Sequence, residues 1–432
     1  MQRKLMKIAQ KLASQIHLRS LRETFVTILP FIILAGIAVL FNNVILGDTG
    51  ILSRFISKDS MAQAQGIGNS IINGTLNIVS ILIVFTLAYM LAKNKKFDAP
   101  IYPGLISISV LIIFMPLMHN IVPNGAKKAV EIGGVLPFQL TNTAGTFVSI
   151  FTAIFTTELF IKLSTLEKMK IKMNENVPPA VEKTFNLLIP VMLTMIIFAL
   201  VSFGINTLTG EGIHKLIAKL IQAPLLGFTT SLPGFLFLMF IFNLLFAFGI
   251  HPSGIVGPIL DPAMLIAMQG NMLAYSNGTT PPHIINTSFQ NMYGLMGGTG
   301  NSLALIIAIL VFSKRKQYRD IAKLALPTGI FNINEPIIFG LPIVFNPILM
   351  IPFVLTTVAS LLVAYLATAM GLVSKAIALV PWTTPPIISQ YLSTGGDLRS
   401  VILGILLLGM SVLIYLPFLK ISDRVAEQEG NA

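Results

Sequence analysis

Residues 331–366 read FNINEPIIFGLPIVFNPILMIPFVLTTVASLLVAYL and contain a single charged side chain, Glu335. Apolar runs of about 20 residues can cross a hydrocarbon core roughly 30 Å thick, and residues 341–366 form such a run. A charge at membrane depth costs roughly 2.5–3.5 kcal/mol on insertion scales. We therefore expect Glu335 to face a cavity or a partner, beside a segment that spans the membrane.

The composition extends this interpretation to the whole chain. The 432 residues are 54% hydrophobic and only 11% charged, whereas soluble domains contain about 25% charged residues. The mean hydropathy is +0.82. The sequence thus predicts an all-α polytopic membrane protein. Nine clear apolar runs lie near residues 24–46, 70–92, 100–119, 143–165, 182–208, 228–250, 301–313, 346–372 and 400–420.

The positive charges predict the orientation of the chain. The net charge is +12, but the lysines and arginines lie in short loops between apolar runs, which is the positive-inside pattern and not a nucleic-acid-binding stripe. With these loops in the cytoplasm, both termini are cytoplasmic and the number of crossings is even. We therefore expect a further crossing within residues 251–300, and about ten in all. The basic, amphipathic residues 1–23 are expected to lie on the cytoplasmic surface as an uncleaved helix.

Three segments rich in Pro, Gly and polar residues interrupt the second half of the chain, at residues 257–301, 324–342 and 379–397. Irregular backbone survives in a bilayer only when it is buried in protein or lines a wet cavity. Broken segments of this kind are typical of a transporter's substrate site. We therefore expect residues 1–220 to form a scaffold and dimer-interface half. Residues 221–432 should form a transport half, with re-entrant segments near 251–300 and 325–345.

Glu335 is the first candidate functional residue. Asn332, Asn334 and the following proline favour a hairpin tip, where two amides and a carboxylate can converge on hydroxyl groups. The alternative is an interfacial carboxylate at a helix end, paired with Lys323.

His251, His283 and Trp382 are further candidates. His251 lies in FGIHPSG, where an apolar run breaks, and an imidazole there can donate to a ligand hydroxyl or share a proton with a carboxylate. Either histidine can instead be a satisfied core residue. Trp382, the only tryptophan, suits an aromatic belt at the membrane surface or stacking on a sugar ring.

Other residues predict structure more than chemistry. Asp261 is expected to cap a helix N-terminus, and Glu158 to pair with Lys162 four residues later. The glycines of MGGTGNS, residues 296–302, favour close helix packing over phosphate binding. The chain has no cysteine and no metal-ligand spacing, so we expect no disulfide, metal or cofactor.

The motifs FGIHPSG, residues 248–254, GIFNINEPIIFGLPIVFNP, residues 329–347, and PWTTPP, residues 381–386, carry a resemblance. The chain resembles membrane (IIC) subunits of the bacterial phosphoenolpyruvate-dependent sugar phosphotransferase system, within the lactose, cellobiose and diacetylchitobiose family. The resemblance implies a homodimer in the cell membrane, with about ten spans and two re-entrant hairpins in each protomer. It also implies that Glu335 and His251 bind sugar hydroxyls. Further sugar contacts that the resemblance implies are Asn332, Asn334 and Trp382.

In this family the IIB component carries the phosphoryl group on a cysteine. Because the chain has no cysteine, we expect IIB to be a separate cytoplasmic protein, with IIA upstream of it. The function that the resemblance implies is uptake of a disaccharide, such as diacetylchitobiose, cellobiose or lactose, coupled to its phosphorylation. Glu335 or His251 would accept the proton of the reacting hydroxyl. The alternative is a proton- or sodium-coupled disaccharide symporter, since a buried Glu beside a His also suits proton coupling.

Overall fold

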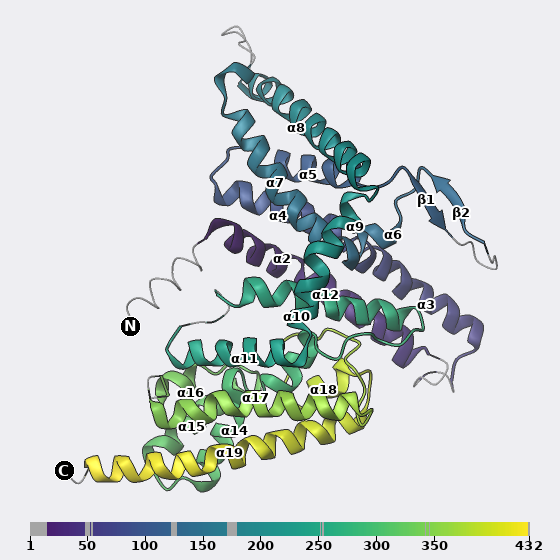
Figure 1. Ribbon diagram of the computed structural model, residues 1–432. Helices are drawn as coiled ribbons and strands as arrows, with labels where there is room; N and C mark the ends of the chain where they lie inside the picture. Colours follow the sequence, from purple (N-terminus) through teal and green to yellow (C-terminus); the bar gives the residue numbers. More distant parts are fainter. Residues whose placement is uncertain are drawn as a thin grey trace. The chain divides into compact units, whose positions relative to one another are not determined.

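The computed structural model describes residues 15–47, 52, 55–121, 128–170, 179–250, 252, 255–341, 343, 344 and 346–430. Helices dominate these residues (Figure 1), which confirms the all-α class. The strands β1 (Met118–Ile121) and β2 (Val130–Gly133) form one antiparallel hairpin in which Met118 lies opposite Gly133.

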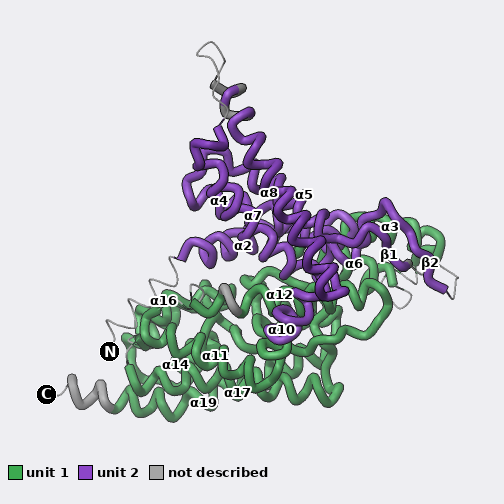
Figure 2. Tube along the Cα trace, turned by 45° about the horizontal axis from the view of Figure 1, so that its top comes forward, with its two compact units in different colours: residues 1–13, 32–72, 226–432 green, residues 14–31, 73–225 purple. Residues whose placement is uncertain are grey.

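The chain divides into two compact units (Figure 2). Unit 1 joins residues 32–72 to residues 226–432, and unit 2 joins residues 14–31 to residues 73–225. Helix α2 (Ile16–Leu40) begins in unit 2 and ends in unit 1. Each unit is built around its own set of packed helices.

Unit 2 is centred on three helices that pack against one another, α4 (Val79–Asn94), α5 (Ile101–Ile113) and α7 (Thr146–Ser164). Leu87, Leu91 and Phe160 are fully buried in its core. Long helix α8 (Pro179–Thr209) packs on α5 and α7. The shorter segments are η3 (Leu76–Ile78), α6 (Phe138–Thr141), η4 (Thr143–Gly145), η5 (Glu167–Met169), α9 (Ile213–Ile217) and η6 (Ala218–Gln222). Helix α10 (Ala223–Thr229) begins in unit 2 and ends in unit 1.

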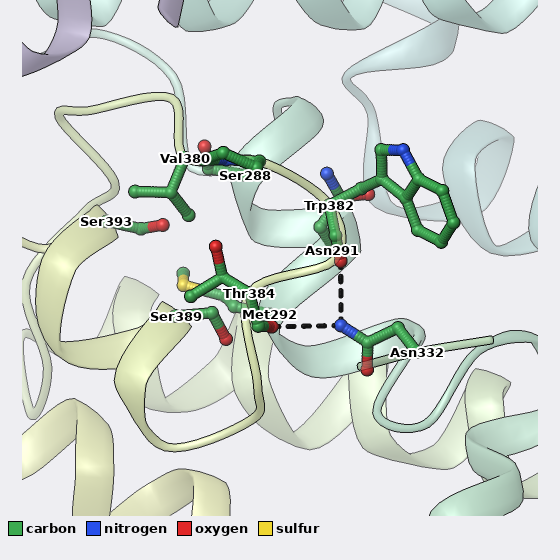
Figure 3. Close-up of a pocket in the computed structure, with 10 residues that line it drawn as sticks. Ser288, Asn291, Met292, Asn332, Val380, Trp382, Thr384, Ser389 and Ser393 are labelled. Atoms are coloured by element: carbon green, nitrogen blue, oxygen red, sulfur yellow. Dashed lines mark hydrogen bonds between the residues drawn. The ribbon is translucent and has the colours of Figure 1, made fainter. Parts of the chain in front are cut away.

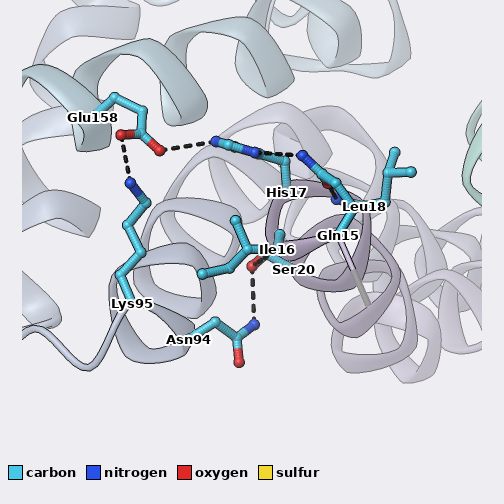
Figure 4. Close-up of polar contacts among 8 residues, drawn as sticks. All are labelled: Gln15, Ile16, His17, Leu18, Ser20, Asn94, Lys95 and Glu158. Carbon is cyan, nitrogen blue, oxygen red and sulfur yellow. Dashed lines mark hydrogen bonds and ion pairs between the residues drawn. The ribbon is translucent and has the colours of Figure 1, made fainter. Parts of the chain in front are cut away.

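Polar side chains tie together three helix ends in unit 2 (Figure 4). The Glu158 carboxylate of α7 lies 2.5 Å from Lys95 Nζ and 2.8 Å from His17 Nε2 of α2. Asn94, at the end of α4, donates to Ser20 Oγ at 2.9 Å. Glu158 therefore links three segments, and the expectation that it pairs with Lys162 was wrong. Tertiary packing brings Lys95 and His17 to the Glu158 carboxylate, and these ion pairs replace the local pair with Lys162.

Unit 1 contains the helices α11 (Leu232–Ala247), α14 (Ser302–Phe312), α17 (Pro347–Ala369) and α19 (Leu398–Gly430), of which α17 packs on both α11 and α19. Phe353 and Tyr415 are fully buried between them. The remaining elements are η1 (Phe41–Ile45), α3 (Lys58–Asn73), α12 (Gly257–Ser276), α13 (Thr287–Phe289), η8 (Gln290–Gly294), η9 (Thr299–Asn301), α15 (Lys316–Ile330), α16 (Glu335–Gly340) and α18 (Ile388–Ser393).

The described residues contain seven helices that are long and apolar enough to span a membrane, and a pair that is bent by 71° between Thr229 and Leu232 forms an eighth candidate. The described residues thus contain seven or eight candidate spans, fewer than the expected ten, and α5 is a further, shorter apolar helix. Helix α12 lies within residues 251–300, where a further crossing was expected, and its 20 residues rise about 30 Å, but it is not among the candidate spans. It begins at Gly257 with Val256 at the N-cap, so the expectation that Asp261 caps a helix was wrong. The helix simply starts one turn earlier.

Candidate functional site

A helical hairpin presents the Asn-Glu motif. Helix α15 ends at Ile330, the chain turns over residues 331–334, and α16 begins at Glu335. Asn332 has φ +64°, in the left-handed region, where Asn is tolerated far better than most side chains because its short amide can bond locally. The hairpin tip expected from the sequence is therefore present, and an asparagine occupies its most demanding position.

Asn332 joins the hairpin to two other segments (Figure 3). Its Nδ2 group donates to the backbone carbonyls of Trp382, at 2.7 Å, and Thr384, at 3.0 Å. Its Oδ1 atom accepts from the backbone N–H of Gly297 at 2.7 Å. One nearly buried side chain thus connects three segments that lie far apart in the sequence.

Asn334 and Glu335 differ sharply in their surroundings. Asn334 is 5% exposed, and its Nδ2 group donates to Thr299 O at 2.9 Å and Thr299 Oγ1 at 2.8 Å. The next residue, Glu335, is exposed. Among the described residues no side chain or backbone group bonds its carboxylate. Lys323, the alternative partner, lies 3.7 Å from Asp320 instead.

The glycine-rich turn of residues 297–301 has a left-handed backbone at four residues, Gly297, Gly298, Gly300 and Asn301. A Cβ atom on Gly298 would lie 2.6 Å from Asn334 Cγ, and one on Gly300 would lie 2.2 Å from the Phe353 ring. Both glycines are therefore required by close packing, which is the interpretation that the sequence favoured.

Buried polar groups from three helices hold this turn. Asn243 Oδ1 of α11 accepts from Gly300 N–H at 2.9 Å. The carbonyl of Gly300 accepts from Thr356 Oγ1 of α17 at 2.9 Å and from the Tyr415 hydroxyl of α19 at 2.6 Å. Sequence reasoning missed Asn243, Thr356 and Tyr415. The signal was present for Asn243, the single amide in the apolar run FLFLMFIFNLLFAF.

A small cavity of about 10 Å³ lies where the hairpin meets the 380–384 loop (Figure 3). Its described lining is mainly polar: Ser288, Asn291, Met292, Asn332, Val380, Pro381, Trp382, Thr384, Ser389 and Ser393. The Trp382 side chain is 54% exposed, and its indole points away from the other lining residues (Figure 3). This volume has room for about one water molecule, far below the roughly 300–1,000 Å³ of typical ligand pockets, so a disaccharide would need the cavity to open widely.

His283 is not part of this cluster. His283 follows α12 and is held by Asn271, whose Oδ1 atom accepts from His283 N–H at 2.9 Å and whose Nδ2 group donates to His283 O at 2.7 Å. Burial, followed by the charge of Lys375, lowers the pKa of the His283 imidazole. His283 is not among the described residues that line the cavity. His251 lies outside the described residues.

The chain is similar in sequence and structure to known proteins over most of its length. Residues 22–357 match the model of the family described as phosphotransferase system, EIIC. The chain is 34% identical to the oligo-beta-mannoside-specific EIIC component of Bacillus subtilis (strain 168), over 98% of this chain and 93% of that protein. It is 31% identical to the cellobiose-specific EIIC component of Geobacillus stearothermophilus, over 99% and 95% of the two chains.

A solved structure agrees with these relatives. The crystal structure of the transporter ChbC, the IIC component from the N,N'-diacetylchitobiose-specific phosphotransferase system, matches with a TM-score of 0.89 and 35% identity. The match covers 99% of this chain and 98% of that one. Such agreement in sequence, length and fold leaves one conclusion: the chain belongs to the phosphotransferase system EIIC family and is a multi-pass membrane component of a sugar phosphotransferase system.

Proposed function

We propose that this protein takes up a disaccharide, such as diacetylchitobiose, cellobiose or lactose, and presents it for phosphorylation by a separate IIB protein. Similar proteins are named for cellobiose, oligo-beta-mannosides and N,N'-diacetylchitobiose, which supports a short oligosaccharide as the substrate. The observation that carries the proposal is Glu335. Its exposed carboxylate has no bonding partner among the described residues, yet it follows directly on Asn334, which is fixed by two hydrogen bonds.

In this proposal Glu335 and His251 bind sugar hydroxyls, and Trp382 offers its exposed ring to a sugar face. His283, Asn332 and Asn334 are the remaining residues of the proposed site, and the amide hydrogens of the two asparagines are already bonded within the protein. Hydrogen bonds to a charged group are worth about 1.5–3 kcal/mol each. Two or three such bonds distinguish sugars that differ in the orientation of one hydroxyl.

The transfer step moves a phosphoryl group from sulfur to oxygen. The S–P bond on the IIB cysteine breaks, an O–P bond to a sugar hydroxyl forms, and the hydroxyl proton passes to Glu335 or His251. Phosphoryl transfer depends chiefly on positioning and electrostatic stabilisation. The membrane subunit would therefore contribute by holding the sugar and by accepting its proton.

We further propose that the protein works as a homodimer in the bacterial cell membrane, in contact with lipid and with both termini in the cytoplasm. The basic loops between the apolar runs support this orientation, since lysine and arginine are concentrated in cytoplasmic loops.

A transport experiment tests the proposed function. Vesicles that contain the protein are supplied with labelled cellobiose or diacetylchitobiose, first with phosphorylated IIB and then with a proton gradient alone. We expect the phosphorylated sugar to appear inside only when IIB is present. Free sugar that accumulates on the gradient alone would instead establish an ion-coupled symporter, with Glu335 as the proton carrier.

A substitution tests the role of Glu335. Glu335→Gln keeps the size of the side chain but removes its charge, so sugar affinity should fall about 10- to 100-fold, the loss expected from one or two charged hydrogen bonds, and Glu335→Ala should abolish binding. Isothermal titration of the purified protein measures both. Glu167→Gln, which changes a carboxylate that is 82% exposed and paired with Lys170, serves as the matched control. Unchanged affinity in both Glu335 variants would remove this residue from the site.

A further inference from the structure

The amide of Asn332 has no hydrogen left for a ligand. An Asn side chain offers two N–H donors and one carbonyl acceptor. In Asn332 both donors are used by the carbonyls of Trp382 and Thr384, and the acceptor is used by Gly297 N–H. Both donors of Asn334 are likewise used, by the carbonyl and hydroxyl of Thr299. A sugar could therefore accept a hydrogen bond from Asn332 only if a bond within the protein were broken.

These bonds determine the position of the neighbouring groups. Asn332 is three residues before Glu335 in the chain, and it bonds the backbone of Trp382 itself. It therefore ties the segment that carries the proposed hydroxyl-binding carboxylate to the loop that carries the proposed stacking ring. Trp382 and Thr384 lie in the segment between helices α17 and α18, and the Asn332 side chain holds the carbonyls of both.

The backbone at Asn332 makes this junction difficult to rebuild with another residue. Its φ of +64° disfavours most L-residues, and a residue without an amide could supply at most part of the three bonds. On the opposite side, Gly298 lets the glycine turn approach closely, because a Cβ atom there would lie 2.8 Å from the Asn332 carbonyl oxygen. The hairpin, the glycine turn and the loop thus lock together at one side chain.

We propose that Asn332 is a positioning residue which fixes the spacing between the Trp382 ring and the Glu335 carboxylate, and thereby selects the length of sugar that the site accepts. The inference rests on the proposed function, because it assigns those two groups to sugar binding. Asn332 itself does not touch the sugar. A disaccharide reaches both groups only when their spacing is fixed, whereas a monosaccharide needs only one of them.

The test uses the full-length protein and its single tryptophan. Asn332→Asp keeps the acceptor for Gly297 N–H but replaces the donors to Trp382 and Thr384 with an oxygen, so the loop should be released. We expect the anisotropy of Trp382 fluorescence to fall without sugar present. Kd is measured for three pairs of a monosaccharide and a disaccharide: glucose and cellobiose, N-acetylglucosamine and diacetylchitobiose, and galactose and lactose. For the pair that the wild type prefers, the ratio of the monosaccharide Kd to the disaccharide Kd should fall at least tenfold.

Asn271→Asp is the matched control. The Nδ2 group of Asn271 also donates to two backbone carbonyls, those of His283 and Ala376, and its Oδ1 atom also accepts one backbone N–H. The same substitution there should lower the thermal unfolding midpoint to a similar extent but leave the fluorescence anisotropy of Trp382 at the wild-type value. Asn332→Gly, which tolerates the left-handed backbone, is the second variant if Asn332→Asp does not fold.

The outcomes separate the two proposals. A wild-type protein that binds none of the six sugars would overturn the proposed function, and this inference with it. Wild-type binding with unchanged anisotropy and unchanged Kd ratio in the Asn332 variant would overturn this inference alone. An equal loss of affinity for both sugars of a pair would also overturn it, because that result reports a general structural defect.

Discussion

At the scale of single residues, the candidate site separates into groups that are bonded and groups that are left free. Asn332 and Asn334 are nearly buried, and their amide hydrogens are engaged, whereas Glu335 and Trp382 are exposed. Sequence reasoning selected all four as candidate sugar contacts, with Glu335 also as a proton acceptor and Trp382 alternatively as an aromatic at the membrane surface. A sequence shows that an amide is present, but only the fold shows whether its hydrogens are already used.

Asp397, just before α19, makes the stability of the folded protein depend on pH. Burial alone would raise the pKa of the Asp397 carboxyl, but hydrogen bonds from Arg399 and Ser374 outweigh it and lower the pKa to about 2. A carboxyl with a depressed pKa in the folded state stabilises the protein above its unfolded pKa of about 3.9, and this contribution is lost as the pH falls toward 2.

We therefore expect Asp397→Asn to lower the thermal unfolding midpoint at neutral pH, and the difference from wild type to shrink as the pH falls from about 4 to about 2. Differential scanning fluorimetry at a series of pH values measures the unfolding midpoints of the variant and the wild type. A difference that stays constant over this range would show that the Asp397 charge adds no pH-dependent stability.

At the scale of elements, the hairpin tip and the glycine turn were predictable in outline. The hairpin contains Pro, Gly and Asn, and the glycine turn contains Gly and Asn. These residues favour turns because Pro fixes φ and because Gly and Asn tolerate a left-handed backbone. Their mutual contact was not predictable. The bonds that hold Gly300 come from residues 57, 56 and 115 positions away along the chain. No local pattern encodes such pairings, because they depend on how α11, α17 and α19 pack.

Gly300→Ala tests the close packing of the glycine turn. The added Cβ atom would meet the Phe353 ring at 2.2 Å, on a backbone with φ +71°. Overpacking and left-handed strain each cost about 1–3 kcal/mol, so the unfolding midpoint should fall markedly. Gly204→Ala in helix α8, where a Cβ atom meets nothing within 4 Å, is the control and should be neutral or stabilising by up to about 1 kcal/mol. Equal midpoints for the two variants would contradict the packing described here.

At the scale of the whole molecule, the hydropathy pattern predicted the helical membrane fold, since each apolar run coincides with a described helix. It did not predict which runs pack together. Residues 32–72 belong with residues 226–432 and not with the rest of the first half. The functional division near residue 220 stays a prediction, because compactness does not reveal which part moves or binds.

The orientation of the termini is testable on the intact cell. A fluorescent protein that matures only in the cytoplasm, fused to either end, should fluoresce, because the positive-inside rule places both ends there. An alkaline phosphatase fusion, active only outside the cytoplasm, should stay inactive at the same positions. Active phosphatase at one end would mean an odd number of crossings and would refute the proposed topology.

The division into units has a mechanical consequence. Within the described residues the chain passes between the units at three places, between residues 31 and 32, 72 and 73, and 225 and 226. The first place lies inside helix α2, one residue after Pro30, whose missing N–H leaves a helical carbonyl unbonded and eases bending. Within the described residues, any displacement of one unit against the other is therefore shared by three covalent connections, and a proline already weakens one of them.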